Sequence, residues 1–234
     1  MNEITDQIYS REYNERLKAR MYKIGEDYYF GVTSICDYAT AKDLQSWMTN
    51  NTKAHVEKKQ NEGKKRGSDL HMYFQKYFTG EDFQIPKEYE MAFDNFIDLV
   101  QKHSIKVHKS EFVVRNDLCG YAGQVDAFGE ANGKPCILDW KTGKRSGRMT
   151  SPQIAAYRKA YMQMNPELKE CGLAFLHVPA DGVEAKFFEV ENIAAVTHAF
   201  AAAFDMVRFL RYYDLKAMNW KWLGTKATQL MEEK

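Results

Sequence analysis

The alternation of apolar and polar residues is clearest in the second half of the chain. Five short segments there are rich in aromatic and β-branched residues, which is typical of strands: residues 105–114, 121–128, 135–140, 172–178 and 185–190. Asn132-Gly133 supplies a tight hairpin turn between the second and third of these segments. A helix is expected from residue 152 to about 164, and a long, alanine-rich helix from 192 to 218.

The first half of the chain has a more helical pattern. Residues 1–20 are polar and compatible with a helix, and residues 21–32 predict a small hairpin with a Gly-Glu-Asp turn. From Thr33 or Ser34, either of which could cap a helix, the chain is expected to be helical and highly charged to about residue 78. A further helix over residues 86–103 carries an apolar stripe.

The order of these elements, helices followed by βββ-α-β-β-α, predicts an α/β core. We expect a mixed central sheet flanked by helices, with an N-terminal helical extension. The chain shows no internal repeat and no interdomain linker, so a single domain is expected over residues 1–234. Within it, residues 1–104 are expected to be mainly helical, 105–218 to form the α/β core and 219–234 to form a tail.

The 234-residue chain has 44% hydrophobic and 28% charged residues, an ordinary globular balance. Its net charge of +1 excludes binding to nucleic acid through overall charge, so any such surface must be local. The four cysteines form no C-x-x-C pair, which argues against a zinc knuckle or a redox motif. The polar N-terminus and the absence of a long apolar run predict a cytoplasmic, intracellular protein with no membrane partner.

The residues that carry chemistry lie along the segment 135–140 and just beyond it. Asp139 and Lys141 alternate with apolar neighbours, so their side chains are expected on one face of the strand. Asp126 occupies the corresponding position of the preceding strand, across the predicted hairpin. Two carboxylates brought together repel each other unless a cation lies between them, and oxygen ligands suit a hard divalent ion. The pattern therefore indicates a metal site.

An isolated Asp-x-Lys pattern is more often a solvated ion pair on an edge strand, because three-residue patterns arise by chance. Here further motifs accompany it in a fixed order. They are Val32-Thr33-Ser34-Ile35, His71 after Arg66-Gly67, Glu111, Gly123-x-x-Asp126, Asp139-x-Lys141 and Gln153-x-x-x-Tyr157. This ordered set resembles the PD-(D/E)xK nuclease superfamily, in the RecB-type branch that includes phage and mitochondrial genome-maintenance exonucleases.

The resemblance implies a restriction-endonuclease-like core and a Mg²⁺- or Mn²⁺-dependent deoxyribonuclease, with exonuclease favoured over endonuclease activity. The substrate implied is DNA ends or single strands in replication, recombination or repair, with a recombination or replication protein as partner. The implied metal ligands are His71, Asp126, Asp139 and the backbone carbonyl of Trp140. The candidate catalytic residues are Asp126, Asp139, Lys141, Glu111, Gln153 and Tyr157. No iron–sulfur cluster is expected, because the last cysteine is Cys171 and the C-terminal cysteines of some relatives are absent.

Each of the accompanying residues also has an ordinary alternative. His71 alone is more often a surface or core histidine, and Glu111 could be a solvated strand residue. Gln153 and Tyr157 share a helix face, which also fits a solvated glutamine beside a core tyrosine. The loop cations Lys144, Arg145 and Arg148 are expected to hold the DNA backbone, although a solvated loop is the alternative. The basic stretch 53–66 is either a guide for single-stranded DNA or a charged helix face.

Two other functions stay open at this point. A catalytically silent nucleic-acid-binding or assembly protein of the same fold is disfavoured, because every residue expected to bind the metal is present in this sequence. A metal-dependent hydrolase of another phosphate ester lacks a Gly-rich phosphate cradle in this sequence but is compatible with the carboxylate pattern.

Overall fold

The computed structural model describes residues 9–49, 53–143, 149–218 and 220. The strands are β1 Tyr9–Asn14, β2 Ala19–Ile24, β3 Asp27–Gly31, β4 Lys106–Asn116, β5 Tyr121–Ala131, β6 Lys134–Lys141, β7 Gly172–His177 and β8 Lys186–Glu189. The helices are α1 Val32–Thr49, α2 Lys53–Thr79, the 3₁₀ turn η1 Lys87–Tyr89, α3 Glu90–Lys102, α4 Thr150–Met164, α5 Ile193–Leu210 and α6 Tyr212–Ala217.

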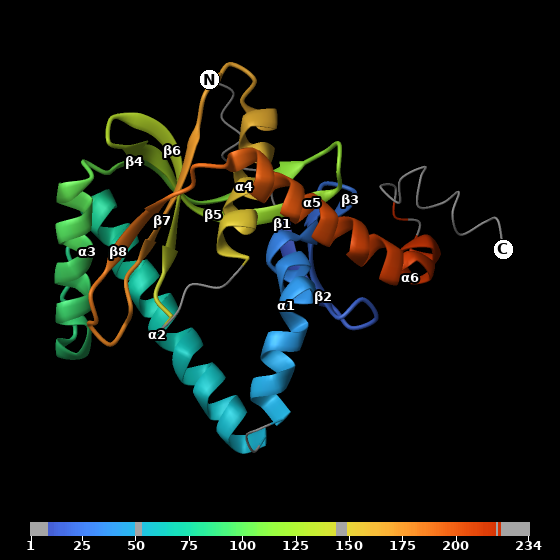
Figure 1. The fold of residues 1–234 in the computed structure, drawn as a ribbon, viewed down its shortest axis with the longest axis horizontal. Helices are drawn as coiled ribbons and strands as arrows, with labels where there is room; N and C mark the ends of the chain where they lie inside the picture. The colour runs from blue at the N-terminus through green and yellow to red at the C-terminus, as the bar shows by residue number, and fades with distance from the viewer. Residues whose placement is uncertain (1–8, 50–52, 144–148, 219, 221–234) are drawn as a thin grey trace.

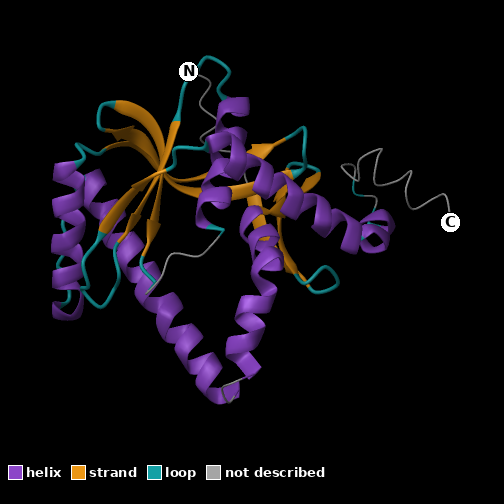
Figure 2. Cartoon of the chain, viewed as in Figure 1, coloured by secondary structure: helices purple, strands orange, loops and turns teal. Residues whose placement is uncertain are grey.

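All eight strands belong to one mixed sheet, with helices on both faces (Figures 1 and 2). The strand order is β1-β2-β3-β5-β6-β7-β8, and β4 pairs with β5 along its other edge. β4, β5 and β6 are antiparallel neighbours, whereas β6 and β7 are parallel and are joined through α4. A parallel pair needs such a crossover, because a tight turn reverses the chain and can join only antiparallel strands. The expected α/β class with a mixed sheet flanked by helices is confirmed.

The two predicted hairpins are confirmed. Asn132 and Gly133 both have positive φ angles, 51° and 76°, as a two-residue type I′ turn requires. This turn sets the register between β5 and β6, from Ala131↔Lys134 to Ala127↔Leu138. In the N-terminal hairpin, Gly25 takes the left-handed conformation between β2 and β3, with φ of 61°.

The N-terminal part contains α1, α2 and α3 but begins with strands, which corrects the helical expectation for the described residues of the segment 1–20. Residues 9–14 form β1 and residues 19–24 form β2, so the hairpins extend the central sheet. β1 is an edge strand that pairs only with β2, and nearly all its side chains are exposed. A strand with no buried face shows no apolar alternation, so its sequence looks like any polar segment.

Two expected helix boundaries are also corrected. α1 begins at Val32, and the Ser34 hydroxyl accepts a hydrogen bond from the Arg20 backbone amide at 2.8 Å. Ser34 therefore ties α1 to β2. The long helix expected over 192–218 is divided at Arg211 into α5 and α6.

A fork in the sheet positions the site. β4 covers one edge of β5 along most of its length, from Tyr121 to Glu130. Along the other edge, β3 pairs only with Tyr121 and Ala122, and β6 pairs only with residues 127–131. The segment 123–126 between them has no strand partner on that edge, which leaves its polar groups accessible to side chains from neighbouring elements.

Apolar side chains pack on both faces of the sheet. On one face, α1, α4, α5 and α6 pack against residues such as Ile137, Leu173 and Val114. On the other face, α2 and α3 build an aromatic cluster beneath Trp140. Phe74 of α2 is central to this cluster, because its ring lies 3.9 Å from that of Phe96 and edge-on to the Trp140 indole.

α5 is long and apolar enough to meet a length and composition test for a membrane span, the one such helix in the described part of the chain. Asp205 and Arg208 interrupt its apolar run, and Phe200, Phe204 and Val207 pack into the core. This test alone is weak support for a span, because core helices of other proteins pass it too.

We predict that Phe74→Ala destabilises the protein by about 3–5 kcal/mol, because it removes a fully buried ring and leaves a cavity. Chemical denaturation of the purified variant measures this cost. Tyr77→Ala on the same helix removes a ring that is 38% exposed and should cost clearly less. Equal costs for the two variants would contradict the packing described for α2.

Candidate metal-dependent active site

Three carboxylates lie in a row across β4, β5 and β6. The register Ser110↔Ala127 and Phe112↔Val125 places Glu111 opposite Asp126. The register of β5 with β6, continued by one residue past Ala127↔Leu138, places Asp126 opposite Asp139. Residues directly opposite one another share a face of the sheet, and like charges in that position are destabilising. The row therefore needs compensating positive charge.

Glu111 occupies this row in a conformation that is unusual for a strand residue. Its φ is +50°, in the left-handed region that favours glycine, although the register of β4 with β5 is the same on both sides of it. Such a conformation costs about 1–3 kcal/mol and persists only where its surroundings hold it. The Gln124 amide donates a 2.6 Å hydrogen bond to Glu111 Oε2, which fixes the carboxylate beside Asp126.

Asp126 connects the row to α2. One carboxylate oxygen accepts a 2.7 Å hydrogen bond from the Trp140 backbone amide, at the point where the β5–β6 ladder stops. The other oxygen lies 3.7 Å from Nδ1 of His71. One donor atom from each of His71, Glu111 and Asp126 lies within 4.8 Å of the others. Two carboxylates and an imidazole within this radius fit a divalent cation such as Mn²⁺ or Mg²⁺.

Asp139 and Lys141 form an ion pair beside this group, with Nζ 2.6 Å from Oδ2. The carboxylate is buried, whereas the lysine side chain is 24% exposed toward the cavity. Lys141 Nζ also lies 3.5 Å from Oε1 of Gln153, whose amide donates a 2.9 Å hydrogen bond to the Tyr157 hydroxyl. The helix α4 thereby fixes the position of the Lys141 ammonium.

Burial and mutual repulsion shift the pKa values of this cluster. Burial raises the pKa of Asp139 to about 6, with Lys141 opposing the rise and Asp126 adding to it. Burial would lower the pKa of Lys141, but Asp139 and Asp126 outweigh it, so that pKa is raised and the amine stays charged. Burial, and then the Asp126 charge, raise the pKa of Glu111. The site therefore holds more negative charge at neutral pH than its own cation offsets.

The glycine of Gly123-x-x-Asp126 has a packing role. A Cβ atom at Gly123 would lie 2.4 Å from Cε1 of Tyr157, far inside van der Waals contact. The tyrosine ring of α4 therefore packs against the bare backbone of β5 within the fork. This contact brings Gln153, one helical turn before Tyr157, within reach of Lys141.

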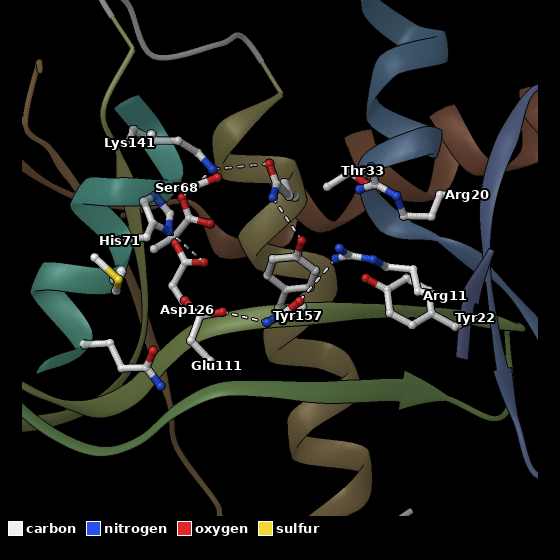
Figure 3. A pocket seen from close by; sticks show the side chains of 16 residues that line it. Arg11, Arg20, Tyr22, Thr33, Ser68, His71, Glu111, Asp126, Lys141 and Tyr157 are labelled. Atoms are coloured by element: carbon white, nitrogen blue, oxygen red, sulfur yellow. Dashed lines mark hydrogen bonds and ion pairs between the residues drawn. The ribbon is translucent and has the colours of Figure 1, made fainter. Parts of the chain in front are cut away.

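These groups line one cavity of about 610 Å³ at the fork of the sheet (Figure 3). The structure brings together every side chain singled out for catalysis from the sequence: His71, Glu111, Asp126, Asp139, Lys141, Gln153 and Tyr157. Asp139 was also expected as a metal ligand. It lies outside the group formed by His71, Glu111 and Asp126, and its carboxylate is paired with Lys141. Lys144, Arg145 and Arg148 lie outside the described residues.

Trp140 contributes to the site through its backbone. Its indole is buried on the opposite face, in the aromatic cluster with Phe74. Its amide faces Asp126, and the carbonyl of a strand residue points to the same side as its amide. The carbonyl expected as a ligand therefore faces the neighbouring strand on the side where the carboxylates lie.

Sequence reasoning did not identify several lining residues. Arg11, Arg20 and Tyr22 come from β1 and β2, and Gln124 lies inside the Gly-x-x-Asp motif without having been given a role. Arg11 donates a 3.2 Å hydrogen bond to Gln124, which in turn holds Glu111. β1 and β2 reach the site only through the long-range pairing of β3 with β5, for which the local sequence carries no signal.

Comparisons with known proteins do not assign the chain to a family. No protein-family model matches the chain, and no curated protein matches it. Among solved structures, the chain is similar to SSO0001, with 13% sequence identity and a TM-score of 0.35. That match covers 76% of this chain and 75% of the other.

The raised pKa of Glu111 predicts how stability changes with pH in the absence of metal. A carboxyl group with a higher pKa in the folded state stabilises the fold at low pH, and this contribution is lost as pH rises through that pKa. Glu111→Gln does not undergo this loss. In EDTA, the variant should therefore gain stability relative to the parent protein as pH rises from about 4, the ordinary pKa region of glutamate, to neutrality.

Thermal unfolding across this pH range measures the difference, with Glu130→Gln as the matched control on the neighbouring strand. Hydrogen bonds from Lys106 and His108 lower the pKa of Glu130, so its replacement should have the opposite sign and reduce stability at neutral pH. The same sign for both variants would contradict the repulsion inferred for the carboxylate row.

Proposed function

We propose that this protein is a divalent-metal-dependent nuclease that hydrolyses DNA phosphodiester bonds. The convergence of His71, Glu111 and Asp126 within 4.8 Å, beside the Asp139–Lys141 ion pair, is the observation that carries the proposal. A restriction-endonuclease-like core of the PD-(D/E)xK type is part of it. The antiparallel β4–β5–β6 unit, followed by α4 and the parallel β7, supports that assignment together with the sequence motifs.

His71, Glu111 and Asp126 would hold Mg²⁺ or Mn²⁺, with Asp139 and the Trp140 carbonyl adjoining them. An ion bound there supplies positive charge that activates water and stabilises negative charge on a phosphate. The imidazole ligand favours Mn²⁺ as a good substitute for Mg²⁺, because nitrogen ligands suit transition ions better than magnesium.

Lys141 is the group of this chain best placed to act on the reacting phosphate. Its ammonium stays charged, because Asp139 and Asp126 outweigh the effect of burial, and Gln153 limits its movement. A fixed cation at this position either stabilises charge that develops on the phosphate or orients the attacking water. Preorganised charge of this kind is worth about 100-fold or more in rate.

The remaining cavity suits a polymeric substrate. Arg11 and Arg20 line the same cavity from the β1–β2 side, opposite Lys141 (Figure 3). A small phosphate ester has no group for these cations, whereas a polynucleotide carries a phosphate on either side of the bond that is cut. The resemblance to exonucleases favours DNA ends or single strands as the substrate.

We predict that the purified protein cleaves labelled DNA with Mg²⁺ or Mn²⁺ and that EDTA abolishes this activity. Asp139→Asn and Lys141→Met should each reduce cleavage by about 100-fold or more, because each removes charge at the reacting centre. Matched controls outside the cavity are Lys134→Met on the same strand, β6, and Glu130→Gln on the neighbouring strand, β5. Single-stranded DNA, duplex DNA and RNA are assayed side by side, with circular dichroism to verify folding.

Folded Asp139→Asn and Lys141→Met proteins that cut at the parental rate would contradict the site. Cleavage of small phosphate esters, with no cleavage of any polynucleotide, would contradict the nuclease assignment while leaving a metal-dependent hydrolase. Metal-independent cleavage would contradict both.

A further inference from the structure

A second cavity of about 360 Å³ adjoins the candidate active site. Its lining comes from the β1–β2 hairpin, the start of α1 and the junction of α5 with α6: Tyr13, Lys18, Arg20, Thr33, Ser34, Asp37, Tyr38 and Arg211. Arg20 and Thr33 line both cavities, so the two are contiguous. Together they lead from the carboxylate row, past the β1–β2 hairpin, to the outer end of α5.

The lining of the second cavity is positively charged. Three cations, Lys18, Arg20 and Arg211, face one carboxylate, Asp37. Within the described residues, Arg20 forms no ion pair within 4 Å, although its charge opposes the rise that burial causes in the pKa of Asp37. Arg211 lies 3.9 Å from Asp214, and the ion pair of Lys18 with Glu15 is largely exposed and therefore weak. A cavity lined by three cations and one carboxylate suits a phosphate backbone.

Two tyrosines alternate with these cations. Tyr13 is 58% exposed, so its ring is accessible to a ligand. Tyr38 is held firmly, because its hydroxyl donates to the Leu17 carbonyl and accepts a 2.7 Å hydrogen bond from Arg211 Nε. Cations that track a backbone, with aromatic rings among them, form the usual surface for unpaired bases.

The walls of this cavity are regular elements that are tied together. Ser34 Oγ accepts a hydrogen bond from the Arg20 amide, and the Arg20 carbonyl lies so close to Gly31 that a Cβ there would be 2.6 Å away. β2 therefore packs closely against the end of β3 at Gly31, and the Ser34 hydroxyl ties it to α1, at the junction of the two cavities. A site on such elements is preorganised, so a ligand binds without first ordering it.

We propose that the second cavity is a subsite for a single-stranded polynucleotide that extends from the candidate active site. This inference rests on the proposed nuclease function. Arg20 and Lys18 hold phosphates of the strand, and Tyr13 stacks against a base. Tyr38, with the Arg211 guanidinium over its ring, forms the wall beside them. A duplex is excluded as the occupant of this path, because its bases are already stacked and paired and present no free face to Tyr13.

The test measures binding of oligothymidylates from about 4 to about 16 nucleotides long to the full chain, in EDTA and in Ca²⁺, by fluorescence anisotropy. Affinity of the parent protein should rise as the strand becomes long enough to reach the second cavity. The double variant Tyr13→Ala, Lys18→Ala should bind the long strands about tenfold or more weakly, with little change for the shortest. Its salt dependence should also fall by about 0.7 in log–log slope, for one lost phosphate contact.

The matched control is Lys23→Ala with Tyr28→Ala. This lysine–tyrosine pair lies on the β2–β3 hairpin, with the ammonium 5.7 Å from the ring, and lines neither cavity. It should leave the dependence on strand length unchanged. Photocrosslinking of the parent protein with 4-thiothymidine strands should place crosslinks on Tyr13 or Tyr38, a result that requires no variant.

Equal losses in the two double variants, crosslinks confined to other surfaces, or the same length dependence for duplexes would overturn the subsite. Failure of the nuclease proposal is distinguishable, because none of these measurements requires cleavage. A chain that binds strands along this path and never cuts them keeps the subsite and contradicts the activity. A chain that cuts DNA but crosslinks elsewhere contradicts the subsite alone.

Discussion

Repulsion among three neighbouring carboxylates is the constraint around which this site is built. Glu111, Asp126 and Asp139 face one another across β4, β5 and β6, and a sheet without function gains nothing from such a row. The chain offsets part of the charge with Lys141 and places His71 beside Asp126. Burial, with the charge of Asp126 adding to it, raises the pKa values of Glu111 and Asp139. Under the proposed function, a bound divalent cation would relieve this repulsion.

The fork of the sheet makes this arrangement accessible. β3 and β6 pair with different parts of the same edge of β5, and residues 123–126 between them have no strand partner there. Side chains of α4 and of the β1–β2 hairpin approach this gap. Tyr157 enters over Gly123, and Arg11 and Arg20 line the opposite wall. The carboxylates of the row and the arginines of the β1–β2 hairpin thus line one cavity, so a chain of nearly zero net charge carries a local concentration of both signs of charge.

Much of the core and of the candidate site follows from local sequence. The alternation in residues 135–140 and the Asn132-Gly133 turn together place Asp126 opposite Asp139, and helical spacing places Gln153 and Tyr157 on one face. Other features depend on distant contacts and leave no local pattern. β1 has no buried face, the roles of Arg11 and Arg20 depend on the β3–β5 pairing, and the left-handed conformation of Glu111 has no signal in its neighbours.

The most direct test of the metal site is a crystal of the protein soaked in Mn²⁺, measured for anomalous scattering from manganese. The expected result is a peak between His71, Glu111 and Asp126, with donor atoms at about 2.0–2.6 Å, as for carboxylate-bound divalent ions. The peak should be lost in Glu111→Gln crystals or in crystals that also contain excess EDTA. A peak elsewhere, or none at saturating Mn²⁺ with the three side chains placed as described here, would contradict the central claim.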